Sequence, residues 1–176
     1  MKNTAKLTLS AICAALATVI MLTGYFPYLT YAIPAVAGLA VMVVCIEIGI
    51  KYAVGTYIAS AFLVLLTAEP ETKILYVLLF GFYPIVKALV EKIGKSPIEW
   101  LIKFAVFNIC IVAYYKLSVS ILGISFDDFG AVGEWGTYVF WAAANVVFVL
   151  YDIAVSRIAM FYISRLHPKI SKIFKI

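Results

Sequence analysis

The stretch ILYVLLFGFYPIVKALVEKI, residues 74–93, decides how we expect this chain to fold. It is apolar enough to be a membrane helix, but Pro84 has no N–H to donate and its ring crowds the carbonyl of Phe80. A helix through this stretch should therefore bend between Phe80 and Pro84. Neighbouring elements must satisfy the backbone groups that the bend frees, because lipid tails offer no hydrogen bonds.

The charged end of the same stretch carries Lys87 and Glu91, which stand four residues apart and so share one helical face. Two interpretations of this pair stay open. In the first, both side chains belong to an ordinary kinked helix and extend to the lipid headgroups. In the second, they form a face that couples to or docks on another protein.

The composition excludes an ordinary water-soluble domain. Of the 176 residues, 65% are hydrophobic and 13% are charged, and the mean hydropathy is +1.07. Soluble domains are about a quarter charged. The sequence therefore predicts an integral membrane protein.

Six apolar stretches approach the ~20 residues that a ~30 Å hydrocarbon layer requires. They predict an all-α membrane protein, a single domain over residues 1–176 in which six transmembrane helices form a compact bundle. The long run of residues 32–67 is divided in two, because Glu47, Gly49 and Lys51 at its middle indicate a tight hairpin. The expected spans are about 6–23, 32–48, 50–67, 74–93, 97–122 and 136–157.

Two local signals concern helix starts. The chain begins like a signal peptide, but no small-x-small cleavage site follows its first apolar run, so we expect this helix to be retained. Ser96, Pro97 and Glu99 have the spacing of an N-cap, a first-turn proline and a capping-box glutamate. This pattern predicts that a helix starts at Ser96.

Charge is divided unequally between the loops. When alternate loops are assigned to opposite faces, one face has 12 Lys and Arg residues and 4 acidic residues. The other face has 2 lysines and 5 acidic residues. The positive-inside rule then places both termini in the cytoplasm of a cell whose plasma membrane the chain crosses repeatedly. The basic amphipathic tail, residues 165–176, suits an anionic lipid surface, and nucleic-acid binding is not expected.

The sequence contains no constellation for catalysis. His167 is its single histidine, and HExxH, GxSxG and phosphate-cradling glycine loops are absent. Cys13, Cys45 and Cys110 lie in apolar runs without CxxC or Cys/His spacing. We therefore predict that the protein is not an enzyme and has no cofactor, metal site or disulfide.

Polar residues inside the spans are few. Asn108 and Asn145 lie near the middles of the fifth and sixth spans, where they either hydrogen-bond to one another or contact a ligand. Asp152 and Arg157 lie lower in the sixth span, and we interpret them as a charge pair near the inner headgroups.

The outer loops differ in kind from the basic inner ones, because they are acidic and aromatic. Together they predict a pocket that opens outward, stacks a flat ring and attracts a positive charge. An interfacial belt of aromatic residues with solvated acids is the alternative. The residues concerned are Tyr25, Phe26, Tyr28 and Tyr31 in the first outer loop and Phe126, Asp127, Asp128, Glu134 and Trp135 in the last.

The first span carries a face of small residues, Thr4, Thr8, Ala11, Ala15 and Thr18, at helical spacing. The motif Ala11-x-x-x-Ala15 lets another helix approach closely. Packing within the bundle and docking of a partner are both compatible with this motif.

With its six short spans, alanine motif, tight inner hairpin and aromatic or acidic outer loops, the chain resembles the substrate-binding S component of an energy-coupling factor transporter. The resemblance implies a bacterial membrane protein that captures a vitamin or similar organic micronutrient from outside. It also implies delivery through a transmembrane coupling protein driven by two cytoplasmic ATPases, with Ala11 and Ala15 docking on the membrane partner. A metal substrate is disfavoured, because the N-terminal histidine of the nickel and cobalt branch is missing here.

Two other classes compete with this interpretation. A structural scaffold of a cell-shape or envelope complex needs lateral helix faces and a cytoplasmic handle but no pocket. A stand-alone transporter should show broken helices in matching halves, and Pro84 has no counterpart.

Overall fold

The computed structural model describes residues 3–26, 29–122 and 136–174, and every regular element within these ranges is helical. This confirms the all-α prediction. In chain order the elements are α1 (Asn3–Leu22), η1 (Thr23–Tyr25), α2 (Ala32–Glu47), α3 (Ile50–Thr67), α4 (Pro70–Leu75), η2 (Tyr76–Phe80), α5 (Tyr83–Val90), η3 (Glu91–Ile93), α6 (Ser96–Leu117), η4 (Ser118–Leu122), α7 (Gly136–Phe161), η7 (Tyr162–Leu166) and α8 (His167–Phe174).

Five helical segments are long and apolar enough to cross a membrane, as expected of a multi-pass membrane protein: Asn3–Tyr25, Ile50–Thr67, Pro70–Ile93, Ser96–Ser120 and Trp141–Ile170. The remaining predicted span corresponds to α2, an apolar helix of 16 residues. At a rise of ~1.5 Å per residue it is about 24 Å long. It lies centrally, in contact with α1, α3, α4, η2, α5 and α7.

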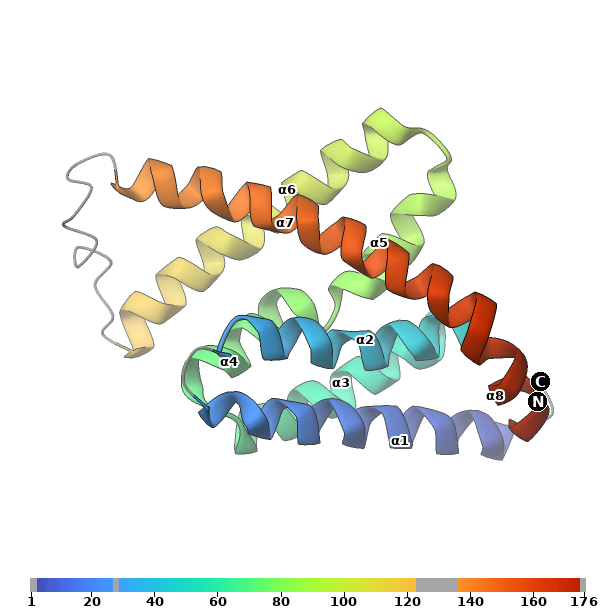
Figure 1. The fold of residues 1–176 in the computed structure, drawn as a ribbon. Helices are drawn as coiled ribbons and strands as arrows, with labels where there is room; N and C mark the ends of the chain where they lie inside the picture. Colours follow the sequence, from blue (N-terminus) through green and yellow to red (C-terminus); the bar gives the residue numbers. More distant parts are fainter. Residues whose placement is uncertain (1–2, 27–28, 123–135, 175–176) are drawn as a thin grey trace.

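The connections alternate between two ends of the molecule (Figure 1). The start of α1, the α2–α3 hairpin and the end of α7 lie at one end, and the α1–α2 and α3–α4 connections lie at the other. The N- and C-terminal elements therefore lie at the same end of the molecule. We call this the terminal end and the other the distal end.

The hairpin expected near Glu47 is present. Helix α2 ends at Glu47 and α3 begins at Ile50, with Gly49 between them at φ +105°. This left-handed backbone conformation strains residues that have a Cβ, so glycine allows the turn to be this short.

The helix of residues 70–93 breaks where Pro84 predicts. The Gly81 amide bonds to the Tyr76 carbonyl, 2.8 Å away, instead of the Val77 carbonyl one turn back. The Tyr57 hydroxyl of α3 donates to the Val77 oxygen at 2.7 Å. A neighbouring helix thus satisfies the carbonyl that the break leaves free, as the lipid environment demands.

The capping prediction at Ser96 is only half right. Helix α6 does begin at Ser96 with Pro97 in its first turn, but the N-cap is Lys95, and its side chain caps nothing. The carbonyl of Lys95 accepts the amides of Ile98 and Glu99 instead. The helix therefore starts without the reciprocal side-chain bonds of a capping box.

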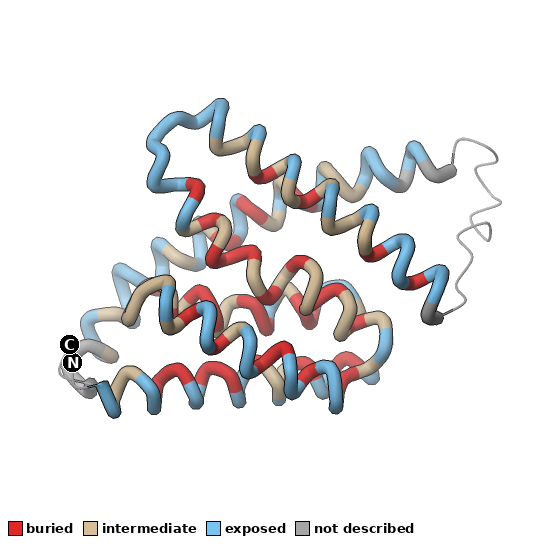
Figure 2. Tube along the Cα trace, turned by 180° about the vertical axis from the view of Figure 1, so that it is seen from behind, coloured by how far each residue is buried: buried red, intermediate tan, exposed pale blue. Residues whose placement is uncertain are grey.

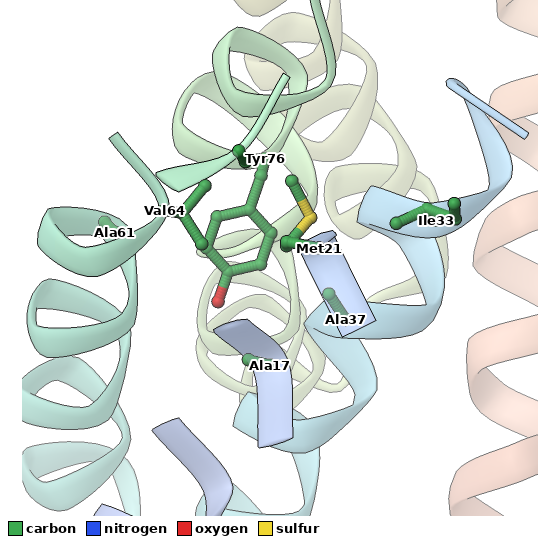
Figure 3. Close-up of a cluster of buried hydrophobic side chains, with 8 residues drawn as sticks. Ala17, Met21, Ile33, Ala37, Ala61, Val64 and Tyr76 are labelled. Atoms are coloured by element: carbon green, nitrogen blue, oxygen red, sulfur yellow. The ribbon is translucent and has the colours of Figure 1, made fainter. Parts of the chain in front are cut away.

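Small residues allow α1, α2 and α3 to pack closely around the start of η2. Ala17, Ala37 and Ala61, from these three helices, surround the buried Tyr76 ring (Figure 3). The Tyr76 hydroxyl shares a hydrogen bond of 2.7 Å with Ser60.

Burial follows the contacts between helices, whereas the outward faces are exposed along much of α1, α3, α6 and α7 (Figure 2). Many of the exposed side chains are large and apolar, including Leu16, Phe62, Ile109 and Val146. So much exposed apolar surface suits contact with lipid tails.

Candidate functional site

A cavity of about 350 Å³ lies between α4, η2, α6 and α7. Tyr31, which directly precedes α2, lines its distal side, so the cavity is nearer the distal end than the charged contacts described below. The lining consists almost wholly of apolar and aromatic side chains: Tyr31, Leu75, Leu79, Phe80, Phe107, Ile111, Tyr114, Ala143, Ala144, Val147, Phe148 and Tyr151. We call it the aromatic pocket.

Rings that pack on one another hold the walls of the aromatic pocket. Phe107 and Phe148 stack with centroids 4.3 Å apart, which joins α6 to α7. Phe80 meets Tyr151 edge-on at 4.9 Å, which joins η2 to α7. These four rings hold one another in place, so this part of the wall is preformed and suits a flat apolar group.

One polar group behind the pocket wall has no hydrogen-bond partner among the described residues. This group is the buried hydroxyl of Tyr151. A buried hydroxyl without a partner costs free energy, because it has lost its bonds to water. The hydroxyl lies toward Gly38 of α2, behind the ring that faces the pocket.

Asn108 and Asn145 hydrogen-bond to one another across α6 and α7. The Asn108 amide donates to the Asn145 side-chain oxygen at 3.0 Å and to the Phe104 carbonyl at 2.8 Å. The Trp141 indole donates to the Asn108 side-chain oxygen. The two asparagines thus hydrogen-bond to one another, which is the first of the two interpretations above. Neither amide lines the aromatic pocket. Ligand contact by these residues stays a prediction.

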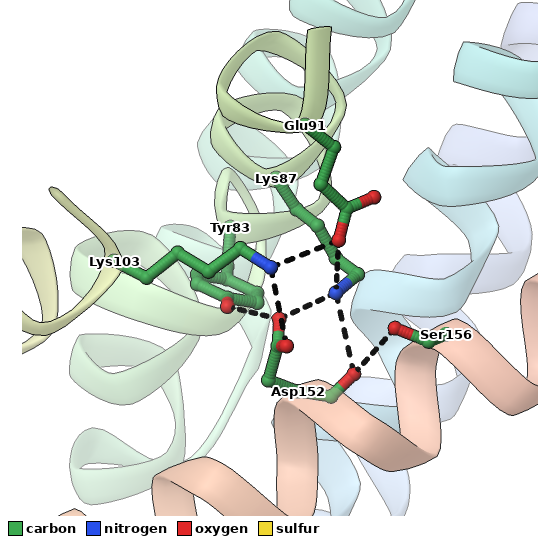
Figure 4. A network of polar contacts seen from close by, with 6 residues as sticks. All are labelled: Tyr83, Lys87, Glu91, Lys103, Asp152 and Ser156. Carbon is green, nitrogen blue, oxygen red and sulfur yellow. Dashed lines mark hydrogen bonds and ion pairs between the residues drawn. The ribbon is translucent and has the colours of Figure 1, made fainter. Parts of the chain in front are cut away.

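Four charged side chains meet between α5, η3, α6 and α7 (Figure 4). The Lys87 ammonium lies 2.5 Å from the Asp152 carboxylate and 2.7 Å from that of Glu91. The Lys103 ammonium bridges the same two acids at 3.2 and 2.8 Å. We call this set the charge network.

Most of the charge network is shielded from solvent. Side-chain exposure is 5–6% for Lys87, Lys103 and Asp152 and 42% for Glu91. The Tyr83 hydroxyl also donates to Asp152 at 2.5 Å. Two cations and two anions balance in this network, which is how charges persist inside a membrane protein.

The charge network corrects the prediction for Asp152. Its carboxylate pairs with Lys87 and Lys103, and Arg157 has no ion pair among the described residues. Arg157 lies five positions further along α7 and is exposed. Five residues amount to about 500° of helical rotation, which turns Arg157 well away from Asp152.

A smaller polar cluster at the terminal end was not predicted. The Glu47 carboxylate accepts from the Tyr162 hydroxyl at 2.7 Å and lies 2.9 Å from His167 Nδ1. It ties the end of α2 to η7 and α8. A signal was present in the sequence, since His167 is the single histidine and Glu47 is a charged residue within a long apolar run.

The other predicted site residues divide into three groups. Tyr25 donates its hydroxyl to the Thr67 carbonyl at 3.1 Å and so ties the first distal connection to α3. Ala11 and Ala15 are exposed on α1, whose neighbours Ala14 and Ala17 are buried. Outside the described residues lie Tyr28, Asp127, Asp128, Glu134 and Trp135.

The aromatic pocket offers apolar and aromatic surface. Its lining includes no nucleophile, acid or base placed for a reaction among the described residues, and these residues contain no cluster that could hold a metal ion. No protein-family model, curated protein or solved structure matches the chain.

Proposed function

We propose that this protein is a membrane-embedded capture subunit that binds a small organic micronutrient, such as a vitamin, in the aromatic pocket. A separate transmembrane coupling protein, driven by two cytoplasmic ATPases, would complete uptake. The observation that carries the proposal is the aromatic pocket itself, a partly open space of about 350 Å³ whose walls include rings that pack on one another.

The size and lining of the pocket support a compact, flat ligand. Binding pockets for small molecules typically enclose about 300–1,000 Å³ and combine apolar walls with a few polar groups. A ring stacked on Phe148 or Tyr151 gains about 0.5–1.5 kcal/mol beyond its buried area.

The described lining favours an uncharged ring. It contains no carboxylate, so among these residues only the faces of the aromatic rings attract a positive charge. The acids proposed to attract a cation, Asp127, Asp128 and Glu134, lie outside the described residues. A positive charge on the ligand therefore stays a prediction that depends on that loop.

The proposed direction of capture follows from the two ends of the molecule. The terminal end carries most of the lysines and arginines, so we propose that it faces the cytoplasm. The aromatic pocket lies toward the distal end, which then faces outward. A ligand would enter from outside and leave after the partner has docked.

Thermal unfolding of the purified protein against a panel of vitamins and heterocycles tests the proposal. A ligand at 100 times its dissociation constant adds about 2.7 kcal/mol to the folded state, which gives a clear rise in Tm. Ala144→Phe fills the pocket and should abolish the rise, whereas Ala142→Phe should retain it, since Ala142 is exposed two positions away on α7 and does not line the pocket.

Two outcomes would contradict the proposal. A panel without any shift, together with co-purification of a cell-shape complex and no ATPase, would favour the scaffold. A shift that Ala144→Phe leaves unchanged would place the ligand outside the aromatic pocket.

A further inference from the structure

A second cavity, of about 440 Å³, lies at the terminal end beside the α2–α3 hairpin. Three lysines from separate elements line it: Lys6 of α1, Lys51 of α3 and Lys92 of η3. Cys45 and Ala88 contribute to its apolar wall. We call it the lysine cavity.

The lysine cavity has no negative charge of its own. None of the three ammonium groups forms an ion pair with an acid among the described residues, and the lining contains no carboxylate. The nearby acids are engaged elsewhere. The Glu47 carboxylate contacts Tyr162 and His167. The Glu91 carboxylate pairs with both lysines of the charge network.

Lys51 and Lys92 are exposed and Lys6 is half-buried, so solvent screens their mutual repulsion, but three like charges on one open cavity make its potential positive. Lys6 is partly stabilised by the Tyr52 ring, 5.6 Å from its ammonium, but this contact leaves its positive charge in place. The arrangement therefore favours an anionic ligand of compact size.

The start of α3 adds to the same potential. Gly49 is its N-cap and has no side chain to bond the first-turn amides, and Gly49, Ile50, Lys51 and Tyr52 all line the cavity. Amides of a first helical turn lack intrahelical acceptors, and the helix dipole is positive at this end. Phosphate groups are the anions that combine well with lysines and such amides.

We propose that the lysine cavity binds a phosphate group. The phosphate diester of an anionic lipid and the phosphate of a soluble molecule share the required chemistry. The proposal is independent of the aromatic pocket, because the two cavities have no lining residue in common.

Cys45 reports on occupancy because it lines the cavity. The full-length protein with Cys13→Ala and Cys110→Ala is reconstituted in phosphatidylcholine bilayers, and the rate of Cys45 labelling by the neutral reagent N-ethylmaleimide is measured. One arm adds increasing fractions of phosphatidylglycerol to the bilayer. The other adds inorganic pyrophosphate at constant ionic strength. Each arm is repeated with Lys51→Gln plus Lys92→Gln and with Lys95→Gln, an exposed lysine nearby that does not line the cavity.

We expect labelling to slow as the phosphate ligand is added. Slowing by phosphatidylglycerol identifies a lipid headgroup, and slowing by pyrophosphate identifies a soluble phosphate ligand. Half-protection should require about fivefold more ligand for each lysine removed, and Lys95→Gln should behave like the parent. The proposal is overturned if neither ligand slows labelling, or if the double lysine variant is protected as well as the parent.

Discussion

The Lys87 ammonium lies 2.5 Å from the Asp152 carboxylate, although 65 residues separate them in the chain. The contact joins α5, just beyond the proline break, to the middle of α7. Lys103 of α6 reaches the same carboxylate group, at 3.2 Å. The segment that the break weakens is therefore held by ionic contacts to both of the following helices.

Replacement of Asp152 by Asn should strongly destabilise the protein. The change leaves Lys87 and Lys103 buried with only Glu91 to balance them, and loss of one partner from a buried ion pair costs about 3–5 kcal/mol. Thermal unfolding in detergent measures the loss. Arg157→Gln is the control, and we expect it to change stability by less than about 0.5 kcal/mol because Arg157 is exposed and has no ion pair among the described residues. Equal effects of the two changes would contradict the role given to the charge network.

The sequence was sufficient to predict the helices, the hairpin at Gly49 and the break at Pro84, because each depends on local backbone chemistry. The partner of Asp152 could not be predicted in the same way. Arg157 is close in sequence, whereas Lys87 and Lys103 come near only through the packing of α5 and α6 on α7.

Replacement of Gly38 by Ala should loosen the contact between α2 and the proline break. A Cβ at Gly38 would lie 2.3 Å from the Phe80 carbonyl oxygen, a backbone atom that cannot move aside alone. We expect a loss of about 1–3 kcal/mol in the free energy of unfolding. Gly55→Ala is the matched control, because a Cβ there meets nothing within 4 Å and helical alanine is favoured by about 0.5–1 kcal/mol. A neutral Gly38→Ala would show that α2 does not need this close approach.

Replacement of Glu69 by Ala should destabilise α4 in a pH-dependent way. Burial alone would raise the pKa of Glu69, but hydrogen bonds from the Thr72 amide and hydroxyl, at 2.8 and 2.5 Å, and the nearby Lys73 lower it overall. The ionised cap therefore contributes stability above the ordinary carboxyl pKa, and this contribution is lost as the pH falls through the lowered value. At neutral pH the substitution should cost about 1 kcal/mol. In acid unfolding curves the difference from wild type should shrink toward zero, and a constant difference would rule out the carboxylate as the cause.

The candidate site was predicted less completely than the fold. Tyr31 is among the residues that line the aromatic pocket, but most of the lining comes from ordinary apolar residues such as Ala144, Phe148 and Leu79. Such residues look the same in the sequence whether they face lipid, another helix or a cavity. Tyr151 was missed for the same reason, since a hydroxyl without a partner is visible only after the fold has placed its neighbours.

Bulky residues on the exposed alanine face of α1 should separate ligand binding from uptake. Ala11 and Ala15 are exposed and lie away from the aromatic pocket, so Ala11→Trp with Ala15→Trp should leave the fold and ligand affinity intact while keeping a partner helix at a distance. Uptake by cells and ligand-induced Tm shifts measure the two properties. Ile12→Trp with Leu16→Trp is the matched control, because these residues have the same spacing and are also exposed, about 100° around the helix. Normal uptake by the alanine variant, or an equal loss in both variants, would mean that this face contacts lipid and no partner docks on it.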